Sequence, residues 1–178
     1  MRTLVLGGIK SGKSQWAEAA IAESLDPVEP VRYLATGSVA EADAGWLERI
    51  AEHRARRPEH WSTVESDDIA AQLRESPGVP TLVDDVGGWL AAVLDRRGWE
   101  YGSISDDVDE MLAAVAAFDS PLVLVSPEVG LMVVPTTASG RRFADELGTA
   151  NQRLADLCDR VVLVVAGQPV QIKPSGTG

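Results

Sequence analysis

The chain has 178 residues, of which 45% are apolar, and this length and composition suit one globular domain with one hydrophobic core. Its formal net charge of -11 argues against a nucleic-acid partner, because a phosphate backbone is held by an excess of Lys and Arg. The longest apolar run, residues 161–166, is too short to span a membrane. The single cysteine, Cys158, allows no internal disulfide, and we expect a cytoplasmic protein.

Short apolar runs alternate with longer amphipathic stretches, which is typical of a parallel sheet with helices on both faces. In chain order, the expected elements are a strand at 3–6, a helix at 13–24, a strand at 31–35, a helix at 43–56, a short helix capped by Asp67 or Asp68, a strand at 81–83, helices at 89–94 and 104–118, a strand at 122–125, a long helix at 139–157 and a strand at 161–165. We expect one domain over residues 1–173 and a disordered tail at 174–178.

A phosphate-binding loop follows the first strand. The run Gly7-Gly8-Ile9-Lys10-Ser11-Gly12-Lys13-Ser14 fits the pattern G-x-x-x-x-G-K-[ST] at every fixed position. Glycine permits the tight turn that points successive backbone N–H groups at phosphate oxygens, and the next helix adds its positive end. Lys13 can reach the β- and γ-phosphates, and Ser14 can bind Mg²⁺. The sequence therefore predicts a P-loop NTPase-like α/β three-layer sandwich with a mostly parallel central sheet, which binds a nucleoside triphosphate with Mg²⁺.

An acidic pair ends the third expected strand. Proteins with this loop usually hold Mg²⁺ with help from a carboxylate at the end of a neighbouring strand, and the run Thr81-Leu82-Val83-Asp84 has that form. Asp84 or Asp85 could instead cap the following helix. We assign Asp84 to the metal and the nucleotide, and Asp85 to the cap.

Both histidines lie in one basic segment, His53-Arg54-Ala55-Arg56-Arg57-Pro58-Glu59-His60-Trp61. If the preceding helix persists, His53, Arg56 and Arg57 share one face. A neutral imidazole can attack phosphorus, and guanidinium groups beside it can hold phosphate oxygens. By periodicity alone, a solvated basic helix end is the simpler interpretation.

Together, these motifs resemble the bifunctional adenosylcobinamide kinase / adenosylcobinamide-phosphate guanylyltransferase family of cobalamin biosynthesis. The resemblance runs from residue 4 to about residue 173. Besides the loop, the runs that carry it are Ala17-Glu18-Ala19, Tyr33-Leu34-Ala35-Thr36, Arg49-Ile50-Ala51-Glu52-His53-Arg54, Arg57-Pro58-Glu59-His60-Trp61, Glu128-Val129-Gly130, Val134-Pro135, Asn151-Gln152-Arg153-Leu154-Ala155 and Val162-Leu163-Val164-Val165-Ala166-Gly167.

The resemblance implies two reactions. The first is phosphorylation of adenosylcobinamide by ATP or GTP, and the second is transfer of GMP from GTP to that phosphate through a guanylylated histidine, which gives adenosylcobinamide-GDP and pyrophosphate. The matching histidine is His53, which reverses the interpretation from periodicity. The resemblance also implies a homo-oligomer, and further nucleotide contacts at Ala35, Thr36, Gly37, Arg54, Ala55, Arg56, Arg57, Glu65 and Asp84.

The sequence departs from the family pattern at three places. Asp84-Asp85-Val86-Gly87 replaces Asp/Glu-Cys-Leu/Ile-Thr, Ser126-Pro127-Glu128 replaces Ser-Asn-Glu, and Met132-Val133-Val134-Pro135 replaces Gly-x-Val-Pro. These are positions where an acceptor or a metal could be handled. Two alternative functions stay open, namely a P-loop small-molecule kinase without nucleotidyl transfer and a non-catalytic nucleotide-sensing protein.

Overall fold

The computed structural model describes residues 1–36 and 57–174. Within these residues, one seven-stranded sheet has the strand order β3-β2-β4-β5-β1-β6-β7. The strands are β1 (Arg2–Gly7), β2 (Arg32–Ala35), β3 (Ser62–Glu65), β4 (Thr81–Asp84), β5 (Leu122–Pro127), β6 (Arg160–Val165) and β7 (Gln168–Lys173). All neighbouring strands are parallel except β6 and β7, which are antiparallel. The expected mostly parallel α/β sheet is therefore confirmed.

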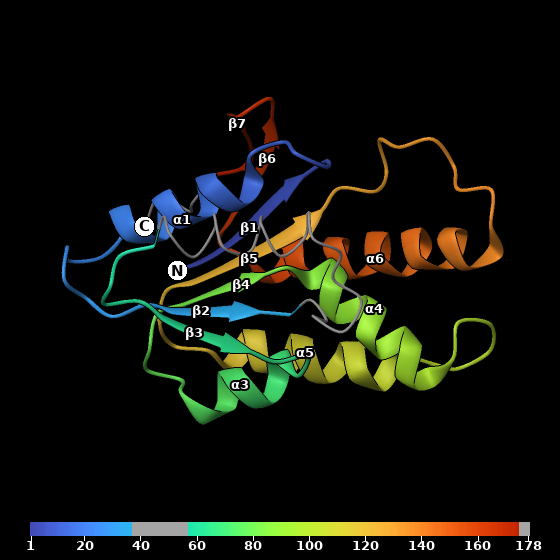
Figure 1. Ribbon diagram of the computed structural model, residues 1–178, viewed down its shortest axis with the longest axis horizontal. Helices are drawn as coiled ribbons and strands as arrows, with labels where there is room; N and C mark the ends of the chain where they lie inside the picture. Colours follow the sequence, from blue (N-terminus) through green and yellow to red (C-terminus); the bar gives the residue numbers. More distant parts are fainter. Residues whose placement is uncertain (37–56, 175–178) are drawn as a thin grey trace.

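Helices cover both faces of this sheet (Figure 1). They are α1 (Lys13–Glu23), α3 (Ile69–Glu75), α4 (Val86–Arg97), α5 (Ser105–Ala117) and α6 (Ala138–Leu157). Helix α1 lies on one face, and the other four helices lie on the opposite face. Because successive side chains of a strand point to opposite faces, β2 contributes to two apolar layers. Leu34 packs in the larger cluster under α3 to α6, and Tyr33 packs in the smaller cluster under α1.

Two strands were not predicted, β3 and β7. Three of the four residues of β3 are exposed, and all six residues of β7 are exposed, so neither strand has a buried apolar run. A tight turn joins β6 to β7, with positive φ at Ala166 (50°) and Gly167 (76°). Positive φ at both central residues is typical of a two-residue hairpin turn. The prediction of five strands was therefore incomplete at both edges of the sheet.

Side chains cap three of the described helices. Asp68 accepts a hydrogen bond from the Ala71 N–H at 2.9 Å, and Thr137 accepts one from Gly140 at 3.1 Å. Asp85 Oδ1 accepts one from Gly88 at 2.7 Å, which confirms its prediction as a cap. The predicted helix at 43–56 lies outside the described residues, as does the end of the tail at 175–178.

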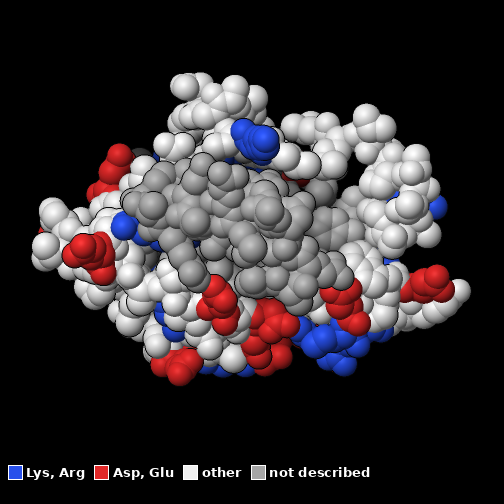
Figure 2. Space-filling model, in the orientation of Figure 1, with Lys and Arg blue, Asp and Glu red and all other residues white. Residues whose placement is uncertain are grey.

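Acidic and basic side chains occur together along the lower edge of the face in Figure 2. Exposed ion pairs on the helices include Arg74 with Glu110 at 2.5 Å and Arg96 with Asp67 at 2.6 Å. Exposed pairs of this kind contribute about 0–1 kcal/mol each, so burial in the two apolar layers dominates stability. No helix of the described ranges is both long and apolar enough to cross a membrane.

Candidate functional site: the phosphate loop and the acids beside it

The predicted phosphate loop connects the carboxyl end of β1 to α1. Gly12 directly precedes helix α1 and has a φ of 90°, and no side chain caps the helix. Lys10 also has a positive φ, 55°. Positive φ values in such a short turn bring successive N–H groups onto one concave side, and an uncapped helix start leaves its first N–H groups for an outside partner. This backbone can receive phosphate oxygens, as the motif predicts.

Close packing explains the glycines at both ends of the loop. A Cβ at Gly7 would overlap Ser11 Oγ and lie 2.9 Å from the Val164 carbonyl oxygen on β6. A Cβ at Gly12 would lie 3.2 Å from Gly167 Cα, in the turn between β6 and β7. The Gly167 N–H donates to the Ser11 carbonyl at 2.8 Å. The β6–β7 turn therefore holds the loop from one side, in a space that only glycine leaves open.

Lys13 lies at the first position of α1, with its side chain folded back over the loop. Its Nζ donates to the Gly8 carbonyl oxygen at 3.3 Å. Burial, and then the charge of Asp84, raise the pKa of Asp85 to about 6, against the lowering effects of the hydrogen bond from Gly88 and of the Lys13 charge. The lysine charge therefore acts on Asp85, directly after β4.

Three of the predicted nucleotide residues lie in one row. Ala35 on β2 is in register with Glu65 on β3 and with Asp84 on β4. Residues in register on parallel strands point to the same face of a sheet, so these residues line one face at the carboxyl ends of the strands. Thr36 joins them, since its N–H donates to the Asp84 carbonyl at 3.2 Å and its hydroxyl donates to the Asp85 carbonyl. Parallel α/β sheets bind ligands at this edge.

The position of Asp84 in the sheet differs from the expectation. A metal-binding carboxylate was expected on the strand next to the loop strand, but β5 lies between β1 and β4. Strand β5, which does lie beside β1, has Pro127 in register with Gly7. Sequence order does not determine strand order, so the intervening strand could not be inferred from the motif.

Arg57, predicted to contact nucleotide, lies against Tyr33. Its guanidinium carbon is 3.2 Å from the ring centre, Nη1 donates to Thr63 Oγ1 at 3.0 Å, and Nε is 3.7 Å from Glu18 Oε1 on α1. Only 8% of the Arg57 side chain is exposed. The Tyr33 hydroxyl in turn donates to Asp84 Oδ2 at 2.5 Å. Burial above all, and then the charge of Asp84, raise the pKa of Tyr33, so the phenol remains a donor.

The remaining residues of the predicted site lie outside the described residues, and their assignments stay predictions. They are Gly37, His53, Arg54, Ala55 and Arg56.

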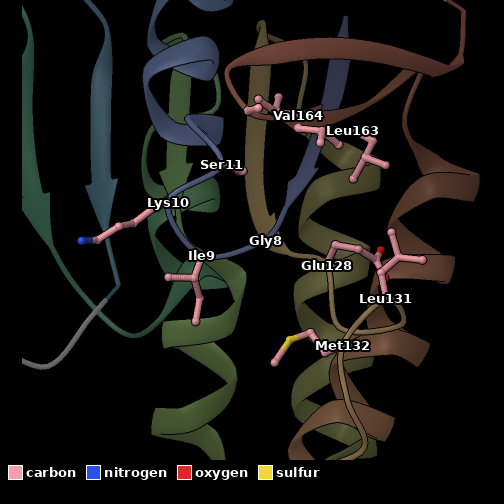
Figure 3. A pocket seen from close by; sticks show the side chains of 11 residues that line it. Gly8, Ile9, Lys10, Ser11, Glu128, Leu131, Met132, Leu163 and Val164 are labelled. Atoms are coloured by element: carbon pink, nitrogen blue, oxygen red, sulfur yellow. The ribbon is translucent and has the colours of Figure 1, made fainter.

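A pocket of about 330 Å³ lies beside the phosphate loop (Figure 3). Its walls are mostly apolar and come from the loop tip, the segment after β5 and the end of β6. Ile9 at the tip is 84% exposed, and Leu131 and Met132 on the opposite wall are 79% and 52% exposed. The loop thus has an apolar space on one side, and the row of Ala35, Glu65 and Asp84 on the other.

Two departures from the family pattern are in contact. A Cβ at Gly87 in α4 would lie 2.8 Å from Pro127 Cγ and 3.0 Å from its Cδ. A threonine at position 87 would therefore not fit against proline at position 127. Asn151 of α6 holds the same strand end, because its amide donates to the Pro127 carbonyl at 3.0 Å and its Oδ1 accepts from the Ser126 hydroxyl at 2.6 Å.

Sequence reasoning assigned no role to Tyr33, Glu18 or Asn151. Each lies in one of the runs that carry the family resemblance, which was the available signal. Tyr33 contacts Asp84, which is 51 positions away, and Glu18 contacts Arg57, which is 39 positions away. Asn151 contacts Pro127 and Ser126, which are 24 and 25 positions away. Contacts over such separations carry no local pattern.

The donor groups of the site suit a Mg²⁺ ion that arrives with a nucleotide. No group of three or more His, Cys, Asp or Glu side chains that could hold a metal occurs in the described ranges. Mg²⁺ in nucleotide sites needs only one or two protein oxygens, because phosphates and waters supply the rest. The Ser14 hydroxyl and the Asp84 carboxylate, both partly exposed, meet that requirement.

Comparisons with known proteins show the family of this chain. A family model described as cobinamide kinase / cobinamide phosphate guanyltransferase matches residues 3–172. The bifunctional adenosylcobalamin biosynthesis protein CobP of Pseudomonas aeruginosa is 40% identical over 176 residues, which cover 97% of this chain and 98% of that protein. The bifunctional adenosylcobalamin biosynthesis protein CobU of Salmonella typhimurium is 35% identical over 187 residues, which cover 97% of this chain and 100% of that protein.

Among solved structures, the P4 protein from bacteriophage phi6 in complex with ADP has a TM-score of 0.47 and 17% identity, over 99% of this chain and 55% of that chain. This likeness is too weak to support an argument. The family model and the relatives match nearly the whole chain. The chain therefore belongs to the cobinamide kinase / cobinamide phosphate guanyltransferase family.

Proposed function

We propose that this chain is a bifunctional enzyme of cobalamin biosynthesis, an adenosylcobinamide kinase and adenosylcobinamide-phosphate guanylyltransferase. In the first reaction it phosphorylates adenosylcobinamide with ATP or GTP. In the second it transfers GMP from GTP to the new phosphate and releases pyrophosphate. The observation that carries the proposal is an open, uncapped phosphate loop, beside a row of acids, in a chain that matches this family over residues 3–172.

In the kinase reaction, this chain's residues bind and orient the triphosphate. The N–H groups of the loop receive phosphate oxygens, and Lys13 places its charge at the β- and γ-phosphates. Ser14 and Asp84 hold Mg²⁺, which when bound neutralises charge on the phosphate oxygens. Ala35, Thr36 and Glu65 complete the nucleotide side of the site. Support comes from the shared register of Ala35, Glu65 and Asp84, and from the effect of the Lys13 charge on Asp85.

In the transfer reaction, the nucleophile is the imidazole of His53. A bond forms between its nitrogen and the α-phosphorus of GTP, while the bridging P–O bond to pyrophosphate breaks. An oxygen of adenosylcobinamide phosphate then displaces the imidazole and takes the GMP group. Arg54 and Arg56 stabilise charge on the phosphate oxygens. Support comes from the match of the basic segment to the family motif.

The test is labelling of the protein with GTP that carries an α-phosphorus label. The wild type is expected to gain one GMP per chain, in an acid-labile and base-stable linkage, and His53→Ala is expected to gain none. The matched control is His60→Ala, because His60 is the other histidine of the chain and is exposed. Absence of label in the wild type would refute the transfer reaction and leave a small-molecule kinase. Pyrophosphate release with a cobinamide acceptor would rule out a non-catalytic nucleotide sensor.

We further propose that the chain forms a homo-oligomer. Support comes from exposed apolar side chains on β6 and on the edge strand β7, namely Val165 (53% exposed), Val170 (48%) and Ile172 (58%). Burial of such side chains against a second copy would remove apolar surface from water. Light scattering coupled to size exclusion is expected to give a multiple of the chain mass, and a lower multiple for Val170→Lys.

A cytoplasmic location is also part of the proposal. Support comes from the single cysteine, Cys158, which is 1% exposed and unpaired. Burial raises its pKa to about 12, so the thiol is inert and no disulfide is needed for stability. Fractionation of cells that express the protein would test this location.

A further inference from the structure

Tyr33 contacts both Asp84, at the end of β4, and Arg57, in the basic segment. Tyr33 lies in the middle of β2, points to the α1 face of the sheet and is 3% exposed. Its hydroxyl donates to Asp84 Oδ2 at 2.5 Å. A hydrogen bond from a neutral donor to a carboxylate is stronger than one between neutral groups, so it restricts how the carboxylate can turn.

Arg57 in turn holds the ring of Tyr33 in place. The guanidinium carbon lies 3.2 Å from the ring centre, which is a cation–π contact. The guanidinium is itself held by Thr63 on β3 and by Glu18 on α1. Since the side chains of Arg57 and Glu18 are only 8% and 11% exposed, water screens these interactions weakly. Helix α1 and strands β2 and β3 together therefore fix the phenol.

Hydrogen bonds to the main chain of Asp84 and Asp85 support the same arrangement. The Thr36 N–H donates to the carbonyl of Asp84, and the Thr36 hydroxyl donates to the carbonyl of Asp85. The backbone of Asp84 is thus attached to the end of β2, while its Oδ2 is attached to Tyr33. Among the residues that the structure describes, Asp84 Oδ2 has a hydrogen-bond donor and Oδ1 has none, which leaves Oδ1 for a ligand of the site.

We propose that Tyr33, clamped by Arg57, is a positioning residue that orients the Asp84 carboxylate toward the Mg²⁺ of the bound nucleotide. This inference rests on the proposed function, which assigns Asp84 to the metal. It gives Arg57 a different task from direct contact with phosphate, because its guanidinium is already occupied by Tyr33, Thr63 and Glu18.

The test measures nucleotide binding instead of turnover. Calorimetry with the α,β-methylene analogue of GTP, without a cobinamide acceptor, avoids both group transfers. The quantity of interest is the ratio of the affinity in Mg²⁺ to the affinity in EDTA. For Tyr33→Phe, this ratio is expected to fall about tenfold, because one hydrogen bond to a charged group is lost, while the affinity in EDTA stays within about twofold. Tyr101→Phe is the matched control, because Tyr101 is the other tyrosine and is 93% exposed.

Asp84→Asn separates the possible failures. If Asp84→Asn leaves the Mg²⁺ ratio unchanged, Asp84 is not a metal ligand, and both the metal assignment and the role of Tyr33 are refuted. If Asp84→Asn lowers the ratio and Tyr33→Phe does not, only the role of Tyr33 is refuted. In the Asp84→Asn background, Tyr33→Phe is expected to have no further effect on the ratio. An equally large effect there would mean that Tyr33 acts through packing alone.

Arg57→Lys tests the clamp, because lysine keeps the charge but loses the planar stack on the ring. It is expected to lower the Mg²⁺ ratio and to leave the affinity in EDTA within about twofold. A fall in EDTA as large as the fall in Mg²⁺ would show direct contact with phosphate and would refute the clamp. Denaturation midpoints for each variant show whether the fold is retained.

Discussion

The contact between Gly87 and Pro127 predicts a coupled pair of substitutions. Gly87→Ala would place a Cβ 2.8 Å from Pro127 Cγ and 3.0 Å from Cδ, and both atoms belong to a rigid ring at the end of a central strand. Pro127→Ala would remove both atoms. The next neighbour of the new Cβ is Asp85 Oδ1 at 3.3 Å, which requires an adjustment of a few tenths of an ångström.

The expected magnitudes follow from these distances. Overpacking costs about 1–3 kcal/mol, and replacing a helical glycine with alanine gains up to about 1 kcal/mol. Gly87→Ala should therefore lower the free energy of unfolding by about 1–2 kcal/mol in the wild type. In the Pro127→Ala background, the same change should be neutral or stabilise by up to about 1 kcal/mol. The coupling energy between positions 87 and 127 is then about 1–3 kcal/mol.

Urea denaturation of the four proteins in this cycle measures the coupling, provided that the denaturant slope is unchanged. Effects of Pro127→Ala alone, including the new N–H, cancel in the cycle. Gly148→Ala is the matched control, since Gly148 is also helical and its Cβ would meet only Val129 Cγ2 at 3.8 Å. It should have the same small effect in both backgrounds. A coupling energy between Gly87 and Pro127 below about 0.5 kcal/mol would refute the steric reasoning.

Four further outcomes are expected. Because the pKa of Asp85 is raised to about 6 in the folded protein, its carboxyl binds a proton more tightly in the folded state than in the unfolded state. The free energy of unfolding, measured in EDTA, should therefore fall as the pH rises from 4 to 6, and Asp85→Asn should remove up to about 3 kcal/mol of that fall. In an absorbance titration of tyrosinate, Tyr101→Phe should give no signal until it unfolds, because burial raises the pKa of the remaining tyrosine, Tyr33. Asn151→Ala should lower the free energy of unfolding, measured by denaturation, by about 1–3 kcal/mol, because the buried Ser126 hydroxyl and the Pro127 carbonyl at the end of β5 lose their hydrogen bonds. Lys13→Ala should slow γ-phosphoryl transfer about 100-fold or more in a kinase assay, and unchanged turnover would contradict the proposed role of its charge.

The sequence predicted the elements whose signals are local. The loop from Gly7 to Ser14 is specified by glycines that turn the backbone, and the first strand before it is a buried apolar run. The cap at Asp85 follows from a short acidic side chain placed before a helix. Each of these signals arises from residues within a few positions of one another.

The rest depends on contacts between distant segments. Strands β3 and β7 are edge strands whose residues are mostly exposed, so no apolar run marks them. The order that inserts β5 between β1 and β4 depends on pairing of β5 with a strand that lies more than one hundred positions earlier in the chain. The placement of Arg57 on Tyr33 joins a loop to a strand that ends more than twenty positions earlier, which hydrophobic periodicity does not record.

The support of the phosphate loop by the β6–β7 turn has a consequence for biosynthesis of the protein. The loop is translated before the segments that support it, because β1 pairs with β5 and β6, and the Ser11 carbonyl accepts a hydrogen bond from the Gly167 N–H. These partners are translated more than one hundred residues later. We therefore expect a nascent chain to expose the loop without the walls that shape it, and to bind nucleotide there only after the β6–β7 hairpin has docked.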